Sequence, residues 1–426
     1  MKTLSLLTLL VVQSLFATAQ QELRIHHINV GDGDATLIGI YDIAAKVYTK
    51  TMLIDGGSAT ASSRILPYLK KVLDKSVPKL DYVALTHYHS DHYKGLLALA
   101  EGSFRADSVI DQGGYDMSLI FPSQHLLVSD DQKPSAMAVY AGWTDALKLA
   151  VSKGYVKGHV TSLFHYGEGS KTNLGNNIVL GSIQGQEVVL ECVAGWGNTL
   201  GTGSIVPNPS PGKDSPNNFT LAFVLRFGQF RYFIGGDLGG DASSSYIDQE
   251  TPLSSYFASR YTSSWSWNHI SQVSGHICGF KADHHGSSYS NTKSFMTAMS
   301  PAICVISAGK QSSWKLPRPR VLEDFSKTKP LSFWTSSSGN TYSQGLYVTN
   351  LFDFQGYPSK TTAIEYFAGK PGVSFSYGNA QEETASSYMI SVAAGEIMQK
   401  SQFQVYRIDD SGAKKKLLAN FFCHTL

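Results

Sequence analysis

The sequence predicts an α/β fold, and three observations carry this prediction. Short apolar segments rich in strand formers, such as residues 23–30, 35–40 and 81–85, are bounded by turn residues. Between them, apolar residues recur at helical spacing, most clearly over residues 62–72. Polar residues able to bind metal follow directly after apolar strands, at residues 86–92 and at Asp237. A sheet that ends in functional loops explains all three observations.

The elements follow in order along the chain. The run Gly31-Asp32-Gly33-Asp34 forms the turn between the first two predicted strands, and a Lys/Pro turn leads from the helix over 62–72 into strand 81–85. Residues 112–186 contain scattered Gly and Ser with one helical stretch at about 134–152, and we expect an insertion that lies over the site. Strands over 221–227 and 231–235 flank Gly228, which predicts a hairpin.

The two ends of the chain differ in character. A basic start, an apolar run over residues 4–16 and the motif Ala17-Thr18-Ala19 predict a secretory signal peptide over residues 1–19. We therefore expect an exported protein (periplasmic, cell-surface or secreted) with no integral membrane span after signal removal. Residues 20–350 form the predicted main domain. Residues 351–426 are expected to form a β-rich C-terminal extension or appendage, or to complete the second sheet.

Charge and cysteine content limit the possible functions. The formal net charge of +2 excludes a chain that binds polyanions over its whole surface, so any nucleic-acid binding must be local. The four cysteines are far apart and form no zinc pattern. Cys304 lies in an apolar run, and we expect it to be a free thiol in the core.

The strongest chemical signal is the run Thr86-His87-Tyr88-His89-Ser90-Asp91-His92. It follows the apolar segment 81–85 and precedes a predicted helix that begins near Tyr93. Such a loop directs its side chains into one small volume, where imidazoles and a carboxylate suit a divalent ion such as zinc. His87 and His89 can reach one ion, while Asp91 and His92 can reach a second.

Three further motifs accompany this run in a fixed order. They are Ile54-Asp55-Gly56-Gly57, then Gly235-Gly236-Asp237, then Asp283-His284-His285-Gly286-Ser287. The ordered set resembles the signature of the metallo-β-lactamase fold superfamily. The resemblance implies an αββα sandwich, in which two mixed sheets pack face to face, helices lie outside, and metals sit at one edge.

A narrower resemblance covers roughly residues 22–350. The runs at 28–35, 217–221 and 284–287, with Ser307-Ala308-Gly309-Lys310, resemble the metallo-β-lactamase domain of ComEC-type DNA-uptake proteins and its stand-alone exported relatives. This sequence departs from that pattern at Asn29 and Asp32. It also has Leu316 and Arg318 where the family has histidines.

The resemblance assigns roles to individual residues. It implies that His87, His89 and Asp237 hold one ion. The second ion would be held by Asp91, His92, Asp237 and either His284 or His285. Asp91 and Asp237 would be the catalytic residues, and an additional histidine ligand is sought among His125, His159 and His165. Residues expected to support the metal loop or contact substrate are Asp34, Asp55, Asn218, Lys281, Ser287, Lys310 and Arg318.

These residues imply a metal-dependent hydrolase. Two divalent ions, with zinc as first choice and manganese as the alternative, would acidify a water that attacks an electrophilic centre. A phosphodiester is the predicted substrate, with nucleic acid as one candidate, because Lys281, Lys310, Lys315, Arg318 and Arg320 gather around the late motifs. The alternatives are a hydrolase of small esters or lactones, and a non-catalytic cell-envelope binding protein stabilised by metal. The intact histidine run argues against the last, whereas the missing late histidine favours it.

Overall fold

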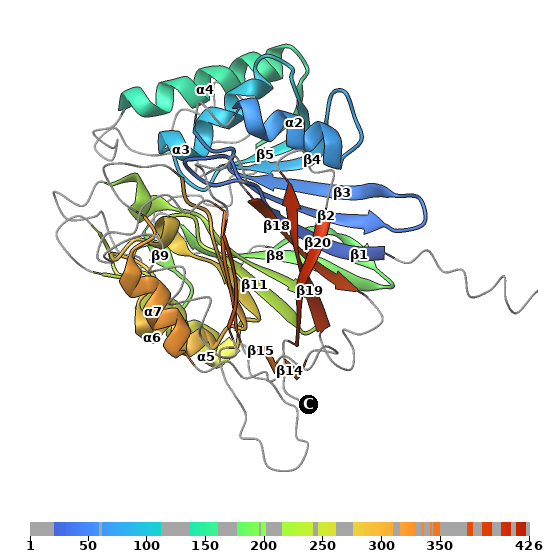
Figure 1. Ribbon diagram of the computed structural model, residues 1–426. Helices are drawn as coiled ribbons and strands as arrows, with labels where there is room; N and C mark the ends of the chain where they lie inside the picture. The colour runs from blue at the N-terminus through green and yellow to red at the C-terminus, as the bar shows by residue number, and fades with distance from the viewer. Residues whose placement is uncertain are drawn as a thin grey trace, which may run out of the picture.

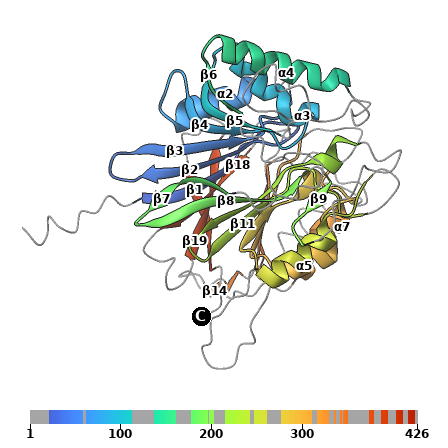
Figure 2. The same ribbon diagram turned by 180° about the vertical axis from the view of Figure 1, so that it is seen from behind.

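Two β-sheets pack face to face, with helices on their outer faces (Figures 1 and 2). The computed structural model describes residues 21–58, 62–111, 137–160, 177–195, 197–201, 215–241, 246–260, 276–309, 316–328, 334–335, 341–342, 344–349, 373–377, 386–393, 402–409 and 415–422. Both sheets contain parallel and antiparallel strand pairs. This arrangement confirms the predicted αββα sandwich.

The first sheet has the strand order β20-β19-β18-β1-β2-β3-β4-β5-β6. Neighbouring strands from β3 to β6 are parallel, and the other pairs are antiparallel. Parallel strands are covered on both faces, which explains the unbroken burial at the ends of β3 and β4. The strands are β1 (Gln21–His27), β2 (Thr36–Asp42), β3 (Val47–Ile54), β4 (Lys79–Ala84), β5 (Arg105–Ile110), β6 (Val156–Val160), β18 (Ser386–Ala393), β19 (Gln402–Asp409) and β20 (Lys415–Phe422).

The second sheet has the order β17-β16-β13-β12-β11-β10-β8-β7, and β9 pairs with β8. The predicted hairpin around Gly228 is confirmed, because β10 and β11 pair antiparallel across it. The strands are β7 (Asn177–Ile183), β8 (Gln186–Gly195), β9 (Asn198–Thr199), β10 (Ala222–Phe227), β11 (Phe230–Ile234), β12 (Gly279–Lys281), β13 (Ile303–Ile306), β16 (Gln344–Val348) and β17 (Val373–Tyr377). A separate pair is formed by β14 (Trp334–Thr335) and β15 (Thr341–Tyr342).

The helices form two groups. Figure 1 shows α2 (Ser62–Val72), α3 (Ser90–Tyr93) and α4 (Met137–Ser152) beside the first sheet. The helices α5 (Glu250–Arg260), α6 (Lys293–Met299) and α7 (Pro319–Lys327) lie beside the second sheet. Short 3-10 helices are η2 (Lys94–Leu99), η5 (Pro216–Phe219) and η6 (Asp283–Gly286).

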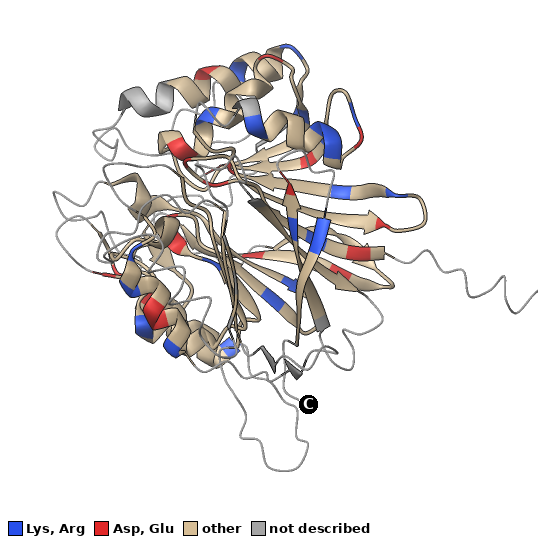
Figure 3. Ribbon diagram, in the orientation of Figure 1, with Lys and Arg blue, Asp and Glu red and all other residues tan. Residues whose placement is uncertain are grey.

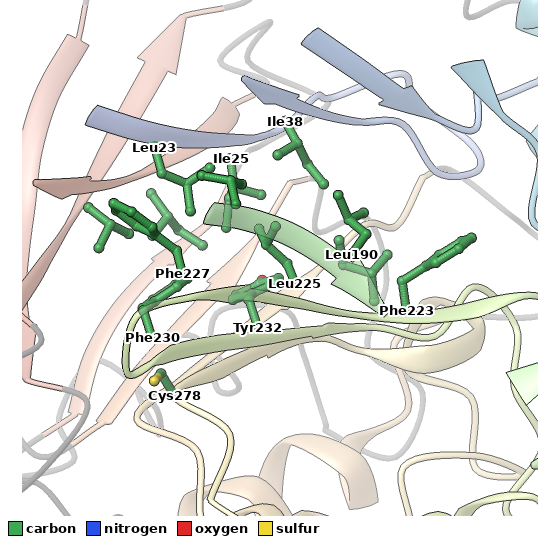
Figure 4. Packing of buried hydrophobic residues seen from close by; sticks show 14 of the residues in the cluster. Leu23, Ile25, Ile38, Leu190, Phe223, Leu225, Phe227, Phe230, Tyr232 and Cys278 are labelled. Atoms are coloured by element: carbon green, nitrogen blue, oxygen red, sulfur yellow. The ribbon is translucent and has the colours of Figure 1, made fainter. Parts of the chain in front are cut away.

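Apolar side chains fill the space between the two sheets. Leu23, Ile25 and Ile38 of the first sheet belong to the same buried cluster as Leu190 and Leu225 of the second (Figure 4). Two further clusters pack the helices against the outer face of each sheet. Cys304 is buried with a free thiol, as expected. Burial of apolar surface therefore stabilises the sandwich in three places: between the two sheets and between each sheet and its helices.

Two expectations about organisation need correction. Of the two alternatives for the C-terminal strands, completion of the second sheet is borne out by β17, while β18, β19 and β20 extend the first sheet instead of forming an appendage. Residues 112–186 are not simply an insertion, because β6 pairs with β5 and β7 begins the second sheet. The expected signal peptide lies outside the described residues. No helix among those described is long and apolar enough to cross a membrane.

Candidate metal centre

The functional loops converge because the strands that carry them end at one edge of the sandwich. The histidine loop follows β4, Asp237 follows β11, and His284 and His285 follow β12, which is parallel to β11. The Thr86 carbonyl accepts a hydrogen bond of 2.9 Å from Leu221 N, so the loop of the first sheet is fixed to the start of β10 in the second. Ligands from both sheets thus meet between them.

The first cluster consists of His87, His89, His284 and one carboxylate oxygen of Asp237. His87 Nε2 lies 3.0 Å from His89 Nδ1 and 3.6 Å from Asp237 Oδ2. His284 Nε2 lies 3.7 Å from the same Asp237 oxygen. These separations suit atoms that share one ion at the zinc–nitrogen distance of about 2.0–2.1 Å.

The second cluster consists of Asp91, His92, His285 and the other oxygen of Asp237. His285 Nε2 lies 3.1 Å from Asp91 Oδ2 and 3.6 Å from Asp237 Oδ1. His92 Nε2 lies 3.3 Å from Asp237 Oδ1 and 3.9 Å from Asp91 Oδ2. Asp237 therefore connects the two clusters, one oxygen facing each.

Atoms without hydrogen-bond partners show that the residues fit metal ions. His92 Nε2, His285 Nε2 and Asp237 Oδ1 are buried, and none makes a well-aligned hydrogen bond, although His285 Nε2 lies 3.1 Å from Asp91 Oδ2 and His92 Nε2 lies 3.3 Å from Asp237 Oδ1. Leaving such groups unpaired in a protein interior costs free energy, so a structure that collects them at one point needs something to satisfy them. A divalent ion accepts all three donors, and a nitrogen and carboxylate set suits zinc.

A family comparison bears on the same segment. The model of the Metallo-beta-lactamase superfamily matches residues 40–104, which include Asp55 and the whole histidine loop. Over this segment the chain is similar to the metallo-beta-lactamase superfamily. No curated protein matches the chain.

Solved structures with a similar arrangement include a point mutant of CmlA beta-hydroxylase, at 12% identity and a TM-score of 0.34. That match covers 71% of this chain and 49% of the other. A second is Zn(2+)-bound PqqB from Methylobacterium extorquens, at 14% identity and a TM-score of 0.29, covering 59% of this chain and 60% of the other. The chain thus spans about half of the first protein and 60% of the second.

Three histidines of the two clusters are oriented by contacts on the side away from the cluster centres. His92 Nδ1 lies 2.8 Å from Asp55 Oδ2, and His285 Nδ1 lies 3.0 Å from the Ser307 carbonyl. Both acceptors require the proton on Nδ1, which leaves Nε2 as a lone pair facing the centre. The Thr86 hydroxyl donates to Asp55 at 2.8 Å, so its lone pair is free to accept from His87 Nδ1 at 3.1 Å. The local folding thereby selects the metal-binding tautomer.

The clusters also shift one another's acidity. Burial by itself would raise the pKa of the Asp237 carboxyl, but His92, His284, His285 and His87 hold that pKa well below its usual range. Burial would lower the pKa of His285, yet Asp237, Asp34 and Asp91 raise it to about 9. Protons thus occupy the second cluster when no ion does, and metal binding would release them.

The late loop adopts an unusual backbone to supply two ligands. His284 and His285 are consecutive residues in the left-handed region, with φ values of 49° and 53°. Such positions cost roughly 1–3 kcal/mol each and persist where the surroundings enforce them, often at functional sites. The bend sends His284 to the first cluster and His285 to the second. The sequence reasoning expected only one of them, and sought the remaining histidine at His125, His159 or His165.

The other residues predicted to support the metal loop or contact substrate have the following positions. Lys281 is buried, and its ammonium contacts Asp34 and the Gly236 carbonyl, so it does not face a substrate. Asn218 accepts from Ile247 N at 2.9 Å, and Ser287 accepts from Tyr289 N at 3.2 Å. Lys310 and Lys315 lie outside the described residues, whereas the half-buried Arg318 donates its backbone N–H to Gly286 O at 2.9 Å.

Two contributors escaped the sequence analysis. Thr86 links Asp55 to His87, as described above, and its place directly before the histidine run was the available signal. The side-chain amide of Asn217 lies 3.4 Å from both ring nitrogens of His284. In the sequence, the only signal for Asn217 was its position directly before Asn218.

Proposed function

We propose that this protein is an exported hydrolase that uses two divalent metal ions, zinc first, to cleave a phosphodiester. The observation that carries the proposal is the position of Asp237, whose two oxygens face two separate histidine clusters. When bound, the pair of ions would supply an acidified water as nucleophile and neutralise charge that builds on the substrate. The chain's own contribution is to fix the ligands and to shape the entrance.

A cation whose backbone is attached to the late loop, Arg318, supports a phosphate-containing substrate. Arg318 follows Pro317, which packs against Gly286, one residue from the metal-facing His285. Among the described residues its guanidinium has no hydrogen-bond or ion-pair partner. A guanidinium is planar and permanently charged, so it can pair with two phosphate oxygens at once. Arg320 is less available, because it donates to the carbonyls of Ser288 and Ser290.

The overall charge distribution favours a small phosphodiester over a long polyanion. Lys and Arg residues are interspersed with Asp and Glu over the helices and strands of both layers (Figure 3). The net charge is only +2. Binding along many phosphates requires several aligned cations, so contact with nucleic acid would be restricted to the site.

A second candidate is a hydrolase of small neutral esters or lactones, and one residue favours it. Asp32 lies near Asp91 and His285, and its Oδ1 is buried without a hydrogen-bond partner. Burial and the neighbouring Asp91 raise the pKa of Asp32. An extra carboxyl beside the centre would oppose a second negative group on the substrate.

A paired assay decides between the candidates. The metal content of the purified protein is measured by atomic emission, followed by hydrolysis of bis(p-nitrophenyl) phosphate and of a neutral p-nitrophenyl ester. We expect about two ions per chain and faster turnover of the diester. Arg318→Ala should reduce turnover of the diester far more than that of the ester, while Arg105→Ala, on β5 away from the loops, should affect neither. Equal loss on both substrates would remove the local support for a phosphodiester.

A ligand variant tests whether metal is needed for turnover. Asp91→Ala removes one second-cluster ligand and should abolish hydrolysis, whereas Asp107→Ala, whose carboxylate pairs with Lys79 and Lys157, should not. Full activity of Asp91→Ala would contradict the proposal.

Export is tested separately: amino-terminal sequencing of protein recovered outside the cytoplasm should give a start near Gln20 or Gln21. Retention of residues 4–16 would instead indicate an anchor.

A further inference from the structure

An aromatic row leads from the first cluster to the surface. The rings of His284 and Tyr246 have centroids 5.8 Å apart, and Tyr246 stacks on Tyr289 at 5.3 Å with an angle of 30° between the planes. Tyr289 is 45% exposed. The row therefore begins at a metal-facing residue and ends in solvent, which is the arrangement expected of a wall beside an active site.

The backbone under Tyr289 is firmly held. Its carbonyl accepts from Gly240 N at 2.9 Å and from Asp241 N at 3.1 Å, and its N–H donates to Ser287 Oγ. The next residue, Ser290, donates its hydroxyl to the Leu238 carbonyl at 2.6 Å. These contacts attach Tyr289 to the loop that carries Asp237, so the exposed ring keeps a fixed position relative to the metal ligands.

Two further side chains bind backbone groups next to Tyr289 and Tyr246 and so fix the position of this aromatic row. Arg320 donates to the Ser288 carbonyl at 2.7 Å and to the Ser290 carbonyl at 3.4 Å, on either side of Tyr289. Asn218, which is fully buried, accepts from Ile247 N and so fixes the residue after Tyr246. Tyr289 is therefore an exposed aromatic ring on a fixed backbone, stacked on a second ring that lies beside the metal-facing His284.

We propose that Tyr246 and Tyr289 form a subsite that stacks on a flat heteroaromatic ring of the substrate, the base of a nucleotide diester. This inference rests on the proposed function and specifies its substrate class. Aromatic faces stack on any base, because every base has a π-face. Because Tyr246 lies beside His284, a base stacked on this pair would bring the linked phosphate toward the first cluster.

Two substrates with the same leaving group test the subsite. Thymidine 5′-(p-nitrophenyl) phosphate carries a base, and methyl p-nitrophenyl phosphate does not. For the zinc-loaded full chain, Tyr289→Ala should raise KM for the thymidine ester about tenfold, since stacking on one aromatic residue contributes between about fivefold and a hundredfold in affinity. KM for the methyl ester should stay within about twofold. Tyr289→Phe keeps the ring and should behave as wild type.

A control variant and a binding measurement distinguish failure of the stacking subsite from failure of the proposed function. Leu417→Ala, 44% exposed on β20, is matched for exposure and should change neither KM. If neither diester is hydrolysed, the proposed function fails, and the subsite is judged by calorimetric binding of thymidine 5′-monophosphate against methyl phosphate. Weaker binding of thymidine monophosphate alone in Tyr289→Ala supports the subsite. Equal effects on both ligands, or none on either, would overturn it.

Discussion

Replacing Asp55 with asparagine should weaken metal binding mainly at the second cluster. The Asp55 carboxylate is buried and accepts three hydrogen bonds of 2.8 Å, from Thr86 N, Thr86 Oγ1 and His92 Nδ1. Asparagine keeps one acceptor oxygen but turns an N–H₂ group toward donors. It fits the backbone, because asparagine tolerates the left-handed conformation found there, where φ is 60°.

The size of the effect follows from the bond that is lost. A hydrogen bond to a charged group contributes about 1.5–3 kcal/mol. Metal affinity should therefore fall roughly 10- to 100-fold, the range typical for removal of a residue that orients a ligand histidine. His87 is connected to Asp55 only through Thr86, so the first cluster should lose less.

Zinc titration against a chromophoric chelator measures both affinities. Asp81→Asn provides a matched control, because Asp81 also accepts from a threonine N–H and hydroxyl, those of Thr51, but lies at the start of β4. Its zinc affinities should equal those of the wild type. Unchanged affinity in Asp55→Asn would refute the reasoning, since it would show that the contact with His92 does not orient the ligand.

Three further outcomes are expected. Lys281→Met removes the ammonium from the buried Asp34 carboxylate, leaves only His285 at 3.7 Å as a charged neighbour, and should cost about 3 kcal/mol in urea unfolding, with much of the loss recovered in Lys281→Met/Asp34→Leu. Gly33→Ala should lower both stability and second-cluster zinc affinity, because φ is +98° and the added methyl would overlap the Asp91 carbonyl. His284→Ala should weaken zinc binding at the first cluster and spare the second; a uniform loss in the same chelator titration would contradict the assignment.

The sequence predicted which residues gather at the site better than it predicted how they divide between the first and the second cluster. The run from His87 to His92 was decisive because its residue types and spacing reflect coordination chemistry directly. The role of His284 was not predictable, because it depends on two consecutive left-handed residues that no local pattern announces. For Lys281 the sequence left two roles open, support of the metal loop or contact with substrate, because its partner Asp34 is far away in sequence.

The fold class was predictable from periodicity, but the ends of the sheets were not. Residues 386–393 carry an alternating pattern that fits a strand, yet only long-range pairing shows that β18 lies beside β1. The same holds for β6, a five-residue strand whose place next to β5 is set by parallel pairing. Short strands carry little information about their neighbours, because register and order are decided by tertiary packing.

The position of the clusters links metal binding to the assembly of the two halves. Each cluster draws histidines from the β4 loop of the first sheet and from the β12 loop of the second, and Asp237 belongs to both. An ion that binds only when these loops meet stabilises the folded state by mass action, about 2.7 kcal/mol at a concentration of a hundred times Kd. The same contact excludes half-assembled states, because neither sheet alone offers a complete ligand set. Asp237 thus connects not only the two clusters but also the loops of the two sheets that carry them.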